Sequence, residues 1–233
     1  YGIKNLCLAG GVALNCVANG RILKEKIFDN IWIQPAAGDA GGSLGAALAL
    51  WHIEQGNKRI VNPTDDMKGS YLGSEFSQKQ IEKELKLIGA KFDIFDYANL
   101  IDKTSDYLSS EKAIGWFQGR MEFGPRALCN RSIICSAEDA GINKSLNKKL
   151  KRTEFMPFAP IVLKSEYNKY FYKIEKTLIN SKFMTMTFDC KKELLQVAPA
   201  IVHVDKTARP QIIDKRTNPK IYNILKEYKK VSG

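Results

Sequence analysis

Two successive units of strand, glycine loop and helix open this chain, and they constrain its fold more than any other feature. Each unit carries a glycine turn between a short apolar run and residues with helical hydrophobic spacing. Backbone N–H groups at the start of such helices can meet phosphate groups. The pattern predicts an α/β segment with a nucleotide or phosphate site. The expected elements are residues 3–9, 10–11 and 12–27 in the first unit, and 31–34, 36–42 and 43–55 in the second.

Ordinary glycine turns between packed elements are the alternative, because the chain has neither a P-loop nor a full dinucleotide-binding fingerprint. The alanine-rich helix expected over 43–55 is interpreted as core packing rather than ligand contact. Asp39, in the second glycine loop, is a single carboxylate, so a turn or helix-cap role competes with metal binding. Polarity rises and periodicity lapses over 56–69, which indicates a connector.

The second segment mixes short strands with helices from about residue 70 onward. Its first helix has Ser77 as a plausible cap before an amphipathic run. This alternation predicts an α+β or mixed α/β arrangement. The expected helices cover 77–88, 98–108, 137–150 and 219–228, and the expected strands cover 113–117, 132–135, 160–163, 183–188, 200–204 and 211–213.

Three arginines, Arg120, Arg126 and Arg131, lie close together in the stretch from 116 to 132. Guanidinium groups bind oxyanions through paired hydrogen bonds and keep their charge at any cellular pH. Glycine and proline between them let the loop fold back and aim several guanidiniums at one point. The stretch is therefore a candidate anion site, with a solvated surface turn as the alternative.

Two later stretches also carry polar chemistry. Basic residues over 148–152 precede a proline-bracketed apolar run and could face the arginines, although a cation preference at a helix C-terminus explains Lys148 and Lys149 equally simply. His203 stands between two expected strands with Asp205 close by. A lone histidine is more often a hydrogen-bonded structural residue than a catalyst.

Composition excludes some classes of protein without choosing a function. With 44% hydrophobic and 26% charged residues, the chain reads as globular, and no apolar run reaches the length of a membrane span. The net charge is +11, of which about nine charges lie beyond residue 62. Such a surplus suits nucleic acid, phosphorylated small molecules or no partner. The five cysteines show no metal or redox spacing, which indicates reduced thiols in a cytoplasmic protein.

Five blocks in one order resemble the O-carbamoyltransferases of the nodulation-protein and antibiotic-carbamoylating type. The strongest is Gly119–Leu128, reading G-R-M-E-F-G-P-R-A-L, with Asn130-Arg131-Ser132 after it. The resemblance covers nearly the whole chain. The other blocks are Gly10–Asn15, Gly38–Gly41, Asn147–Pro160 and Thr207–Gln211.

The resemblance implies two domains. Residues 1–62 would form the C-terminal part of an actin/hexokinase-like (ASKHA) domain, 63–69 a linker, and 70–233 a YrdC-like mixed α/β domain. In such enzymes the YrdC-like domain uses carbamoyl phosphate and ATP to form carbamoyl adenylate. The other domain transfers the carbamoyl group to a substrate hydroxyl near a bound iron or other divalent metal. The acceptor would be a small molecule with a hydroxyl group, such as a sugar or an aminoglycoside. Neither a membrane nor a nucleic acid is an expected partner. The oligomeric state stays open, and a homodimer is one possibility.

Residue by residue, the resemblance assigns three groups of candidates. The phosphate-holding catalytic group is Arg120, Arg126, Arg131, Lys151, Arg152 and Arg209. The group for the adenosine side is Gly10, Gly11, Val12, Asn15 and Gly38. Asp39 is the one candidate metal ligand in this segment. Several fixed positive charges would offset the repulsion between two strongly anionic substrates.

Departures from the family pattern shape the remaining expectations. Met156 replaces an arginine, the preceding basic segment is one residue shorter, and Cys129 stands where glycine is common. The chain opens on a strand without an initiator Met and ends before a further family block, so we expect a fragment without complete turnover. The rival hypotheses are a basic nucleic-acid-binding module and a sugar-kinase-like phosphotransferase.

Overall fold

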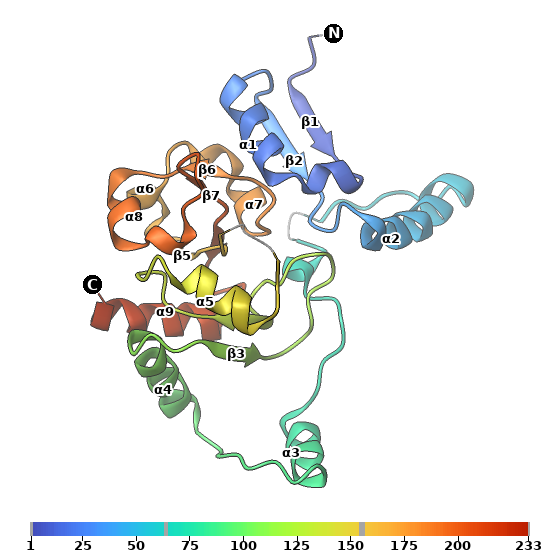
Figure 1. Cartoon of the computed structure of the whole chain (residues 1–233). Helices are drawn as coiled ribbons and strands as arrows, with labels where there is room; N and C mark the ends of the chain where they lie inside the picture. The colour runs from blue at the N-terminus through green and yellow to red at the C-terminus, as the bar shows by residue number, and fades with distance from the viewer. Residues whose placement is uncertain (1, 63–64, 154–156, 233) are drawn as a thin grey trace.

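The computed structural model of the chain combines short paired strands with helices placed around them (Figure 1). It describes residues 2–62, 65–153 and 157–232. The strands are β1 (Asn5–Leu8), β2 (Asn30–Ile33), β3 (Ile114–Phe117), β4 (Arg131–Ile134), β5 (Ile161–Leu163), β6 (Phe188–Asp189), β7 (Thr207–Ala208) and β8 (Gln211–Ile213). The α-helices are α1 (Cys16–Glu25), α2 (Asp39–Ala49), α3 (Gln78–Leu87), α4 (Tyr97–Ser109), α5 (Ile142–Lys149), α6 (Tyr167–Tyr170), α7 (Leu178–Ser181), α8 (Lys192–Val197) and α9 (Pro219–Ser232). Shorter helical turns are η1 (Gly11–Leu14), η2 (Leu50–Glu54), η3 (Lys68–Ser70), η4 (Ile174–Thr177) and η5 (Pro199–Ile201).

The strands pair two by two within the described residues. β1 and β2 run parallel and are joined through η1 and α1, which confirms the first predicted strand–loop–helix unit. β5 and β8 are also parallel, whereas β3 with β4 and β6 with β7 are antiparallel. The chain is therefore a mixed α/β protein, compatible with the predicted α+β class.

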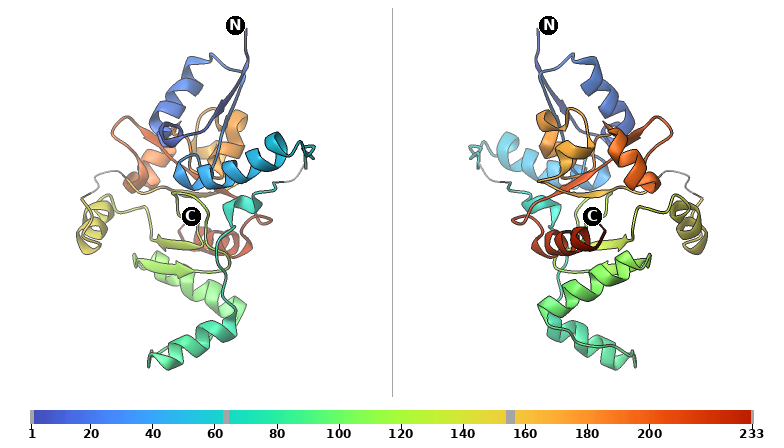
Figure 2. Two further views of the ribbon diagram at one scale, coloured as in Figure 1. Left: turned by 90° about the vertical axis from the view of Figure 1, so that its right-hand side faces the viewer. Right: turned by 90° about the vertical axis from the view of Figure 1, so that its left-hand side faces the viewer.

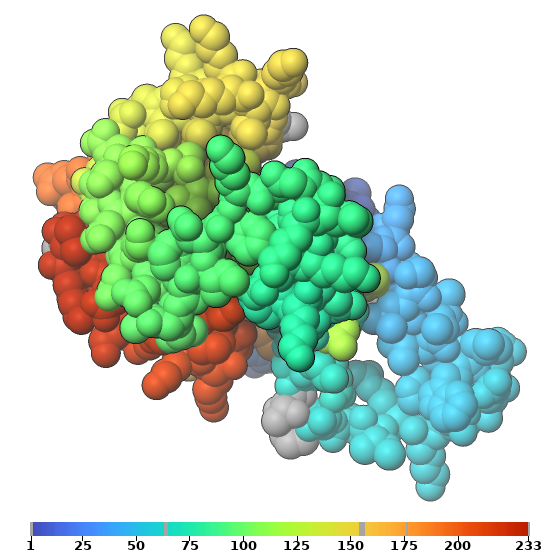
Figure 3. Space-filling model, turned by 90° about the horizontal axis from the view of Figure 1, so that it is seen from below, coloured from blue at the N-terminus to red at the C-terminus, as the bar shows by residue number. Residues whose placement is uncertain are grey.

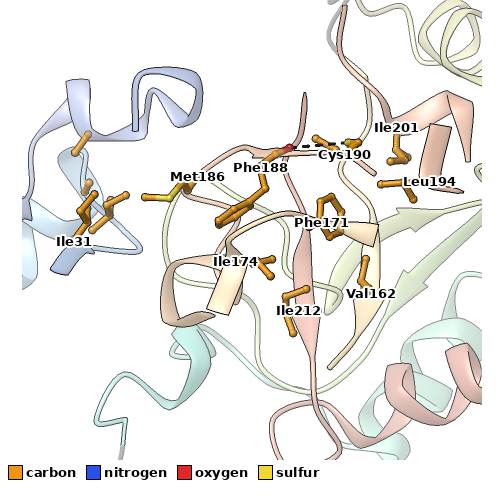
Figure 4. Close-up of a cluster of buried hydrophobic side chains, with 14 residues drawn as sticks. Ile31, Val162, Phe171, Ile174, Met186, Phe188, Cys190, Leu194, Ile201 and Ile212 are labelled. Atoms are coloured by element: carbon orange, nitrogen blue, oxygen red, sulfur yellow. Dashed lines mark hydrogen bonds between the residues drawn. The ribbon is translucent and has the colours of Figure 1, made fainter. Parts of the chain in front are cut away.

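The main hydrophobic core is shared by the beginning and the later part of the chain (Figure 4). Ile31 and Ile33 of β2 are buried together with Phe171, Met186 and Phe188. The predicted domain division at 63–69 stays a prediction, but both sides of it contribute side chains to this core. Burial of apolar surface at this junction holds the two segments together.

A second core lies beneath the β3–β4 hairpin. Trp116 of β3 and Ile134 of β4 point into it, and α4 and α9 cover it with Ile101, Ile221 and Ile224. Alternation along the strands explains the choice of side chains, because residues two apart share one face of a strand. The hairpin thereby gives a packed base to the arginine-rich loop that joins its strands.

Helices α2 and α3 extend away from this body, as the side views show for α3 (Figure 2) and the view from below shows for α2 and η2 (Figure 3). The interpretation of residues 43–55 as core packing was wrong, because no residue of α2 is buried. The helix also starts earlier, at Asp39, and continues as η2 in a π-helical turn. Within the described chain α2 packs chiefly against its own continuation, so its small and apolar side chains face solvent. None of the described helices has the length and apolarity that crossing a membrane requires.

Several predicted elements need correction. The strand expected over 200–204 is the helical turn η5, since Val202 N–H donates to the carbonyl of Pro199. Only the last residue of the run 183–188 is a strand, because the run turns at Met184, which has a φ of +53°. The helix expected over 137–150 begins at Ile142, after a turn capped by Asp139.

Candidate functional site

The arginine loop, residues 118–131, turns back on itself after β3 and ends with the first residue of β4. Gly119 and Gly124 have φ values of +45° and +123°, which side chains other than glycine rarely adopt. The loop also pairs with the segment before α3, where Phe123 N–H donates to the carbonyl of Ser70 at 2.6 Å. These constraints give the loop a defined shape on the hairpin.

Buried polar groups fill the inside of the arginine loop. The Glu122 carboxylate is only 8% exposed and accepts backbone N–H groups from the other arm of the loop. The Tyr71 hydroxyl donates to the carbonyl of Leu128 at 2.7 Å, and burial raises the pKa of this phenol well above its usual range. Burial likewise raises the pKa of the Cys129 thiol far above normal, and the nearby charge of Glu122 acts in the same direction. The interior of the loop is thus fixed rather than open to solvent.

Arg126 crosses from the arginine loop to the first segment. Its Nη2 donates to the carbonyl of Leu14 at 2.8 Å, directly before α1. The Nε of the same side chain is buried and has no hydrogen-bond partner among the described residues. Gly124 lets the arginine loop pack closely against Ala36 of the first segment. A Cβ at position 124 would lie only 3.1 Å from the Cβ of Ala36, which is too close for an ordinary contact. Arg126 therefore brings an unsatisfied donor to the glycine loops of the first segment.

Arg209 reaches the same place from a distant part of the sequence. It is half-buried after β7, and desolvation lowers the pKa of its guanidinium while the nearby Cys16 opposes that shift. Burial raises the pKa of the Cys16 thiol, and the Arg209 charge partly offsets this effect. Cys16 is the first residue of α1 and follows Leu14 by two positions. Geometry agrees with this proximity, because Ala208 pairs with Phe188 and the N–H of the preceding Thr187 donates to the carbonyl of Cys16. Arg126 therefore contacts Leu14, and Arg209 lies near Cys16.

Arg120 and Arg131 make different contacts. The Arg131 guanidinium lies 3.5 Å from the centre of the Phe117 ring, and its donors meet four backbone carbonyl groups of the loop and its neighbour. Arg120 donates to the carbonyl of Gly73 and lies 3.5 Å from the carboxylate of Glu75. These two guanidiniums hold the loop to residues 73–75 and do not join Arg126 at residues 14–16. Arg120 also lines an open pocket of about 490 Å³ with Glu75, Phe76 and Ser77.

Lys151 and Arg152 follow the C-terminus of α5 and are exposed. Arg152 N–H donates to the carbonyl of Asn147, and its guanidinium lies 5.9 Å from the ring of Phe158. Lys148 and Lys149 occupy the last turn of α5, where the helix dipole favours cations. Met156 falls outside the described residues. The phosphate-binding role of Lys151 and Arg152 stays a prediction.

The two glycine loops lie against each other beside Arg126. Gly10 N–H donates to the carbonyl of Ala37 at 2.7 Å, and a Cβ at Gly38 would lie 3.3 Å from the side chain of Leu14. Asn15 caps α1 by accepting the N–H of Ala18. The predicted adenosine-side residues Gly10, Gly11, Val12, Asn15 and Gly38 are thus brought together around one corner, where Val12 is 87% exposed.

Asp39 begins α2 next to this corner and is exposed. No group of three or more histidine, cysteine, aspartate or glutamate side chains that could hold a metal occurs in the described part of the chain. A lone carboxylate does not make a metal site. The described residues therefore do not fit a bound metal by themselves, and the role of Asp39 stays a prediction.

Sequence reasoning missed the residues that organise this region. Glu122 is the only acidic residue between 116 and 132, which was a usable signal for a special role. Asn180 gave no comparable signal, although its buried side chain accepts from Ile33 N–H and donates to the carbonyl of Ile31. Gln118, Asn130 and Asn218 form a further buried hydrogen-bonded group beneath the loop.

Comparison with known proteins gives matches along most of the chain. Residues 1–48 match the family described as "Carbamoyltransferase N-terminus", and residues 105–233 match "Carbamoyltransferase C-terminus". The chain is 44% identical to an uncharacterized protein of Synechocystis over 97% of the chain and 40% of that protein. It is 37% identical to the nodulation protein NolO of Bradyrhizobium diazoefficiens, over 98% of the chain and 41% of that protein. It is 36% identical to the nodulation protein NolNO of Sinorhizobium fredii, over 100% of the chain and 34% of that protein. The chain therefore spans about two fifths or less of the length of these relatives.

Proposed function

Because the chain belongs to the carbamoyltransferase family, we propose that it is part of an enzyme that transfers a carbamoyl group to a substrate hydroxyl. The substrates in this proposal are carbamoyl phosphate, ATP and water, which give carbamoyl adenylate with release of inorganic phosphate and pyrophosphate. The acceptor is a small molecule with hydroxyl groups, such as a sugar or an aminoglycoside.

The transfer step needs no covalent intermediate on the protein. The acceptor oxygen attacks the carbamoyl carbon of carbamoyl adenylate, and a new C–O bond forms. The bond between that carbon and the phosphate oxygen breaks, AMP leaves with the bonding electrons, and the hydroxyl proton passes to solvent. Fixed positive charge and N–H donors beside the leaving phosphate lower the barrier, because they stabilise the charge that develops on it.

One observation supports this proposal most strongly. Arg126 and Arg209 are separated by more than eighty residues in the sequence, yet Arg126 donates to the carbonyl of Leu14 and Arg209 lies near Cys16, the first residue of α1. Arg126 keeps a buried Nε without a hydrogen-bond partner among the described residues. Leaving a buried donor unsatisfied is costly, so this Nε favours a ligand that can reach it. An anionic ligand would satisfy it.

The described residues supply no metal site, so no step of this proposal passes through a metal. Their own contribution is binding and orientation. The glycine loops allow a ligand to approach the backbone closely, and the two guanidiniums fix its anionic groups. Close approach at the glycine loops and charge from the guanidiniums suit a reaction in which positioning and charge stabilisation provide most of the rate acceleration.

Exchange of labelled pyrophosphate into ATP, measured on the full-length protein, tests the proposal. Exchange should require carbamoyl phosphate. The variants Arg126→Ala and Arg209→Ala should each lower the exchange rate by about 100-fold, a typical loss for one preorganised donor. Arg21→Ala is the matched control, because this exposed arginine forms an ion pair with Glu25 on α1, away from the arginine loop. Exchange that does not depend on carbamoyl phosphate, or that survives both substitutions, would contradict the proposal.

Fluorescence anisotropy with double-stranded RNA separates the main rival. Binding that falls steeply with salt and does not respond to carbamoyl phosphate would favour a nucleic-acid-binding module.

A further inference from the structure

Glu122 is a buried carboxylate in a loop that is otherwise rich in positive charge. It is 8% exposed, and among the described residues no lysine, arginine or histidine forms an ion pair with it. A buried carboxylate must be satisfied by hydrogen bonds, since its removal from water is costly. The identity of its donors therefore indicates what Glu122 does.

The donors are backbone N–H groups from the far arm of the arginine loop. Glu122 Oε1 accepts from Leu128 and Asn130 at 2.7 Å each and from Arg131 at 3.1 Å. Residues 123–127 form the arch between the carboxylate and these donors, and Arg126 lies on that arch. Glu122 thus closes the loop across its base and limits the directions in which Arg126 can project.

Other side chains hold the same arm of the loop from its carbonyl side. Tyr71 donates to the carbonyl of Leu128, and Gln211 does so at 3.3 Å. Gln118 donates to the carbonyl of Cys129 at 3.0 Å. Among the described residues, Glu122 is the side chain that accepts the N–H groups of Leu128 and Asn130. Its loss would leave two or three buried donors unsatisfied at one point.

We propose that Glu122 is a positioning residue for Arg126, and that its carboxylate fixes the arginine loop so that the guanidinium meets the substrate anion at the start of α1. This inference rests on the proposed function. Glu122 itself does not touch the substrate. Displacement of a catalytic group by about 1 Å can cost up to about 100-fold in rate, so a residue that sets the course of the loop has a large effect.

Hydrogen exchange measured by mass spectrometry on the full-length protein tests the structural half. In Glu122→Ala, peptides that contain residues 128–131 should exchange at least about tenfold faster than in the wild type, since these amides lose their acceptor. Glu25→Ala, which removes an exposed glutamate from α1, should leave these peptides unchanged. Unchanged protection of 128–131 in Glu122→Ala would overturn the inference, whether or not the protein has carbamoyltransferase activity. If Glu122→Ala does not fold, the isosteric Glu122→Gln carries the same test with a smaller effect.

A double-mutant cycle tests the functional half. If Glu122 acts through Arg126, Glu122→Ala should slow pyrophosphate exchange at least about tenfold in the wild type but less than about twofold in an Arg126→Ala background. If Glu122 had only a structural role, Glu122→Ala would lower the pyrophosphate exchange rate by the same factor in both backgrounds. That result would overturn the inference. If the wild type shows no pyrophosphate exchange that depends on carbamoyl phosphate, only the proposed function is refuted. The hydrogen exchange of residues 128–131 would still report whether Glu122 fixes the loop.

Discussion

Replacing Gly20 with alanine should destabilise the protein, whereas the same change at Gly45 should stabilise it. Both glycines lie within α-helices, Gly20 in α1 and Gly45 in α2, so helix propensity favours alanine at both positions. Their surroundings differ. A Cβ at Gly20 would lie 2.7 Å from the carbonyl oxygen of Thr187 and would also collide with its hydroxyl oxygen, but a Cβ at Gly45 would meet no atom within 4 Å.

The magnitudes follow from these contacts. Alanine gains about 0.8–1 kcal/mol over glycine in a helix. The Thr187 backbone cannot shift easily, because its N–H donates to the carbonyl of Cys16 at 3.1 Å. Forcing a methyl group against such a neighbour costs about 1–3 kcal/mol, and direct overlap with a backbone oxygen places the cost at the upper end. Gly20→Ala should therefore destabilise by about 1–2 kcal/mol, and Gly45→Ala should stabilise by about 0.5–1 kcal/mol.

Urea unfolding followed by far-UV circular dichroism measures both effects. The two variants should differ in their midpoints and share the wild-type slope, since a change in midpoint alone reports stability. The two variants should differ in free energy of unfolding by about 1.5–3 kcal/mol. If Gly20→Ala proves as stable as Gly45→Ala, α1 does not pack closely against Thr187. The position of α1, which Arg126 and Arg209 approach, would then be wrong as well.

Three further outcomes can be measured in the same way. Cys129 has a φ of +73°, so Cys129→Gly should be about 1 kcal/mol more stable than Cys129→Ala, and a more stable alanine variant would exclude this backbone geometry. Asn180→Ala should lower the free energy of unfolding by about 2–4 kcal/mol, because it leaves the N–H of Ile33 and the carbonyl of Ile31 buried without the Asn180 side chain. A loss below about 0.5 kcal/mol would contradict these two hydrogen bonds. Burial lowers the pKa of His203 below its usual value, so its contribution to stability is full above about pH 6.5 and is lost as pH falls through the lowered pKa. His203→Gln should therefore lose less stability than the wild type between pH 7.5 and pH 5, about the range in which histidine titrates, and parallel losses would contradict the assignment.

Local signals predicted much of the secondary structure. Ser77 caps α3 in a capping box with Gln80, as the hydroxyl residue before an amphipathic run indicates. The strands on either side of the arginine loop were also expected, because apolar runs meet turn-forming residues at both ends. These elements depend on neighbours within a few positions in the sequence.

Features that depend on distant partners could not be predicted in this way. The apolar composition of α2 indicated a buried helix, but burial requires a neighbour, and within the described chain little packs on it. The polar junction at Asn180 depends on backbone groups of β2 almost 150 positions earlier. Periodicity carries no information about such pairs, because the partner is chosen by the packing of the whole fold.

The arginine loop shows why counting positive residues is a weak guide to an anion site. The Arg131 guanidinium donates to backbone carbonyl groups and stacks on Phe117, so few of its N–H donors are left for a ligand. Arg120 is partly neutralised by Glu75. Arg126 has the same charge and the same sequence surroundings, yet it keeps a buried Nε with no partner among the described residues. Because leaving a buried donor unsatisfied costs free energy, a ligand that accepts from this Nε would regain that cost on binding. The three arginines are therefore unequal candidates, and substitution of Arg126 should weaken anion binding more than substitution of Arg131.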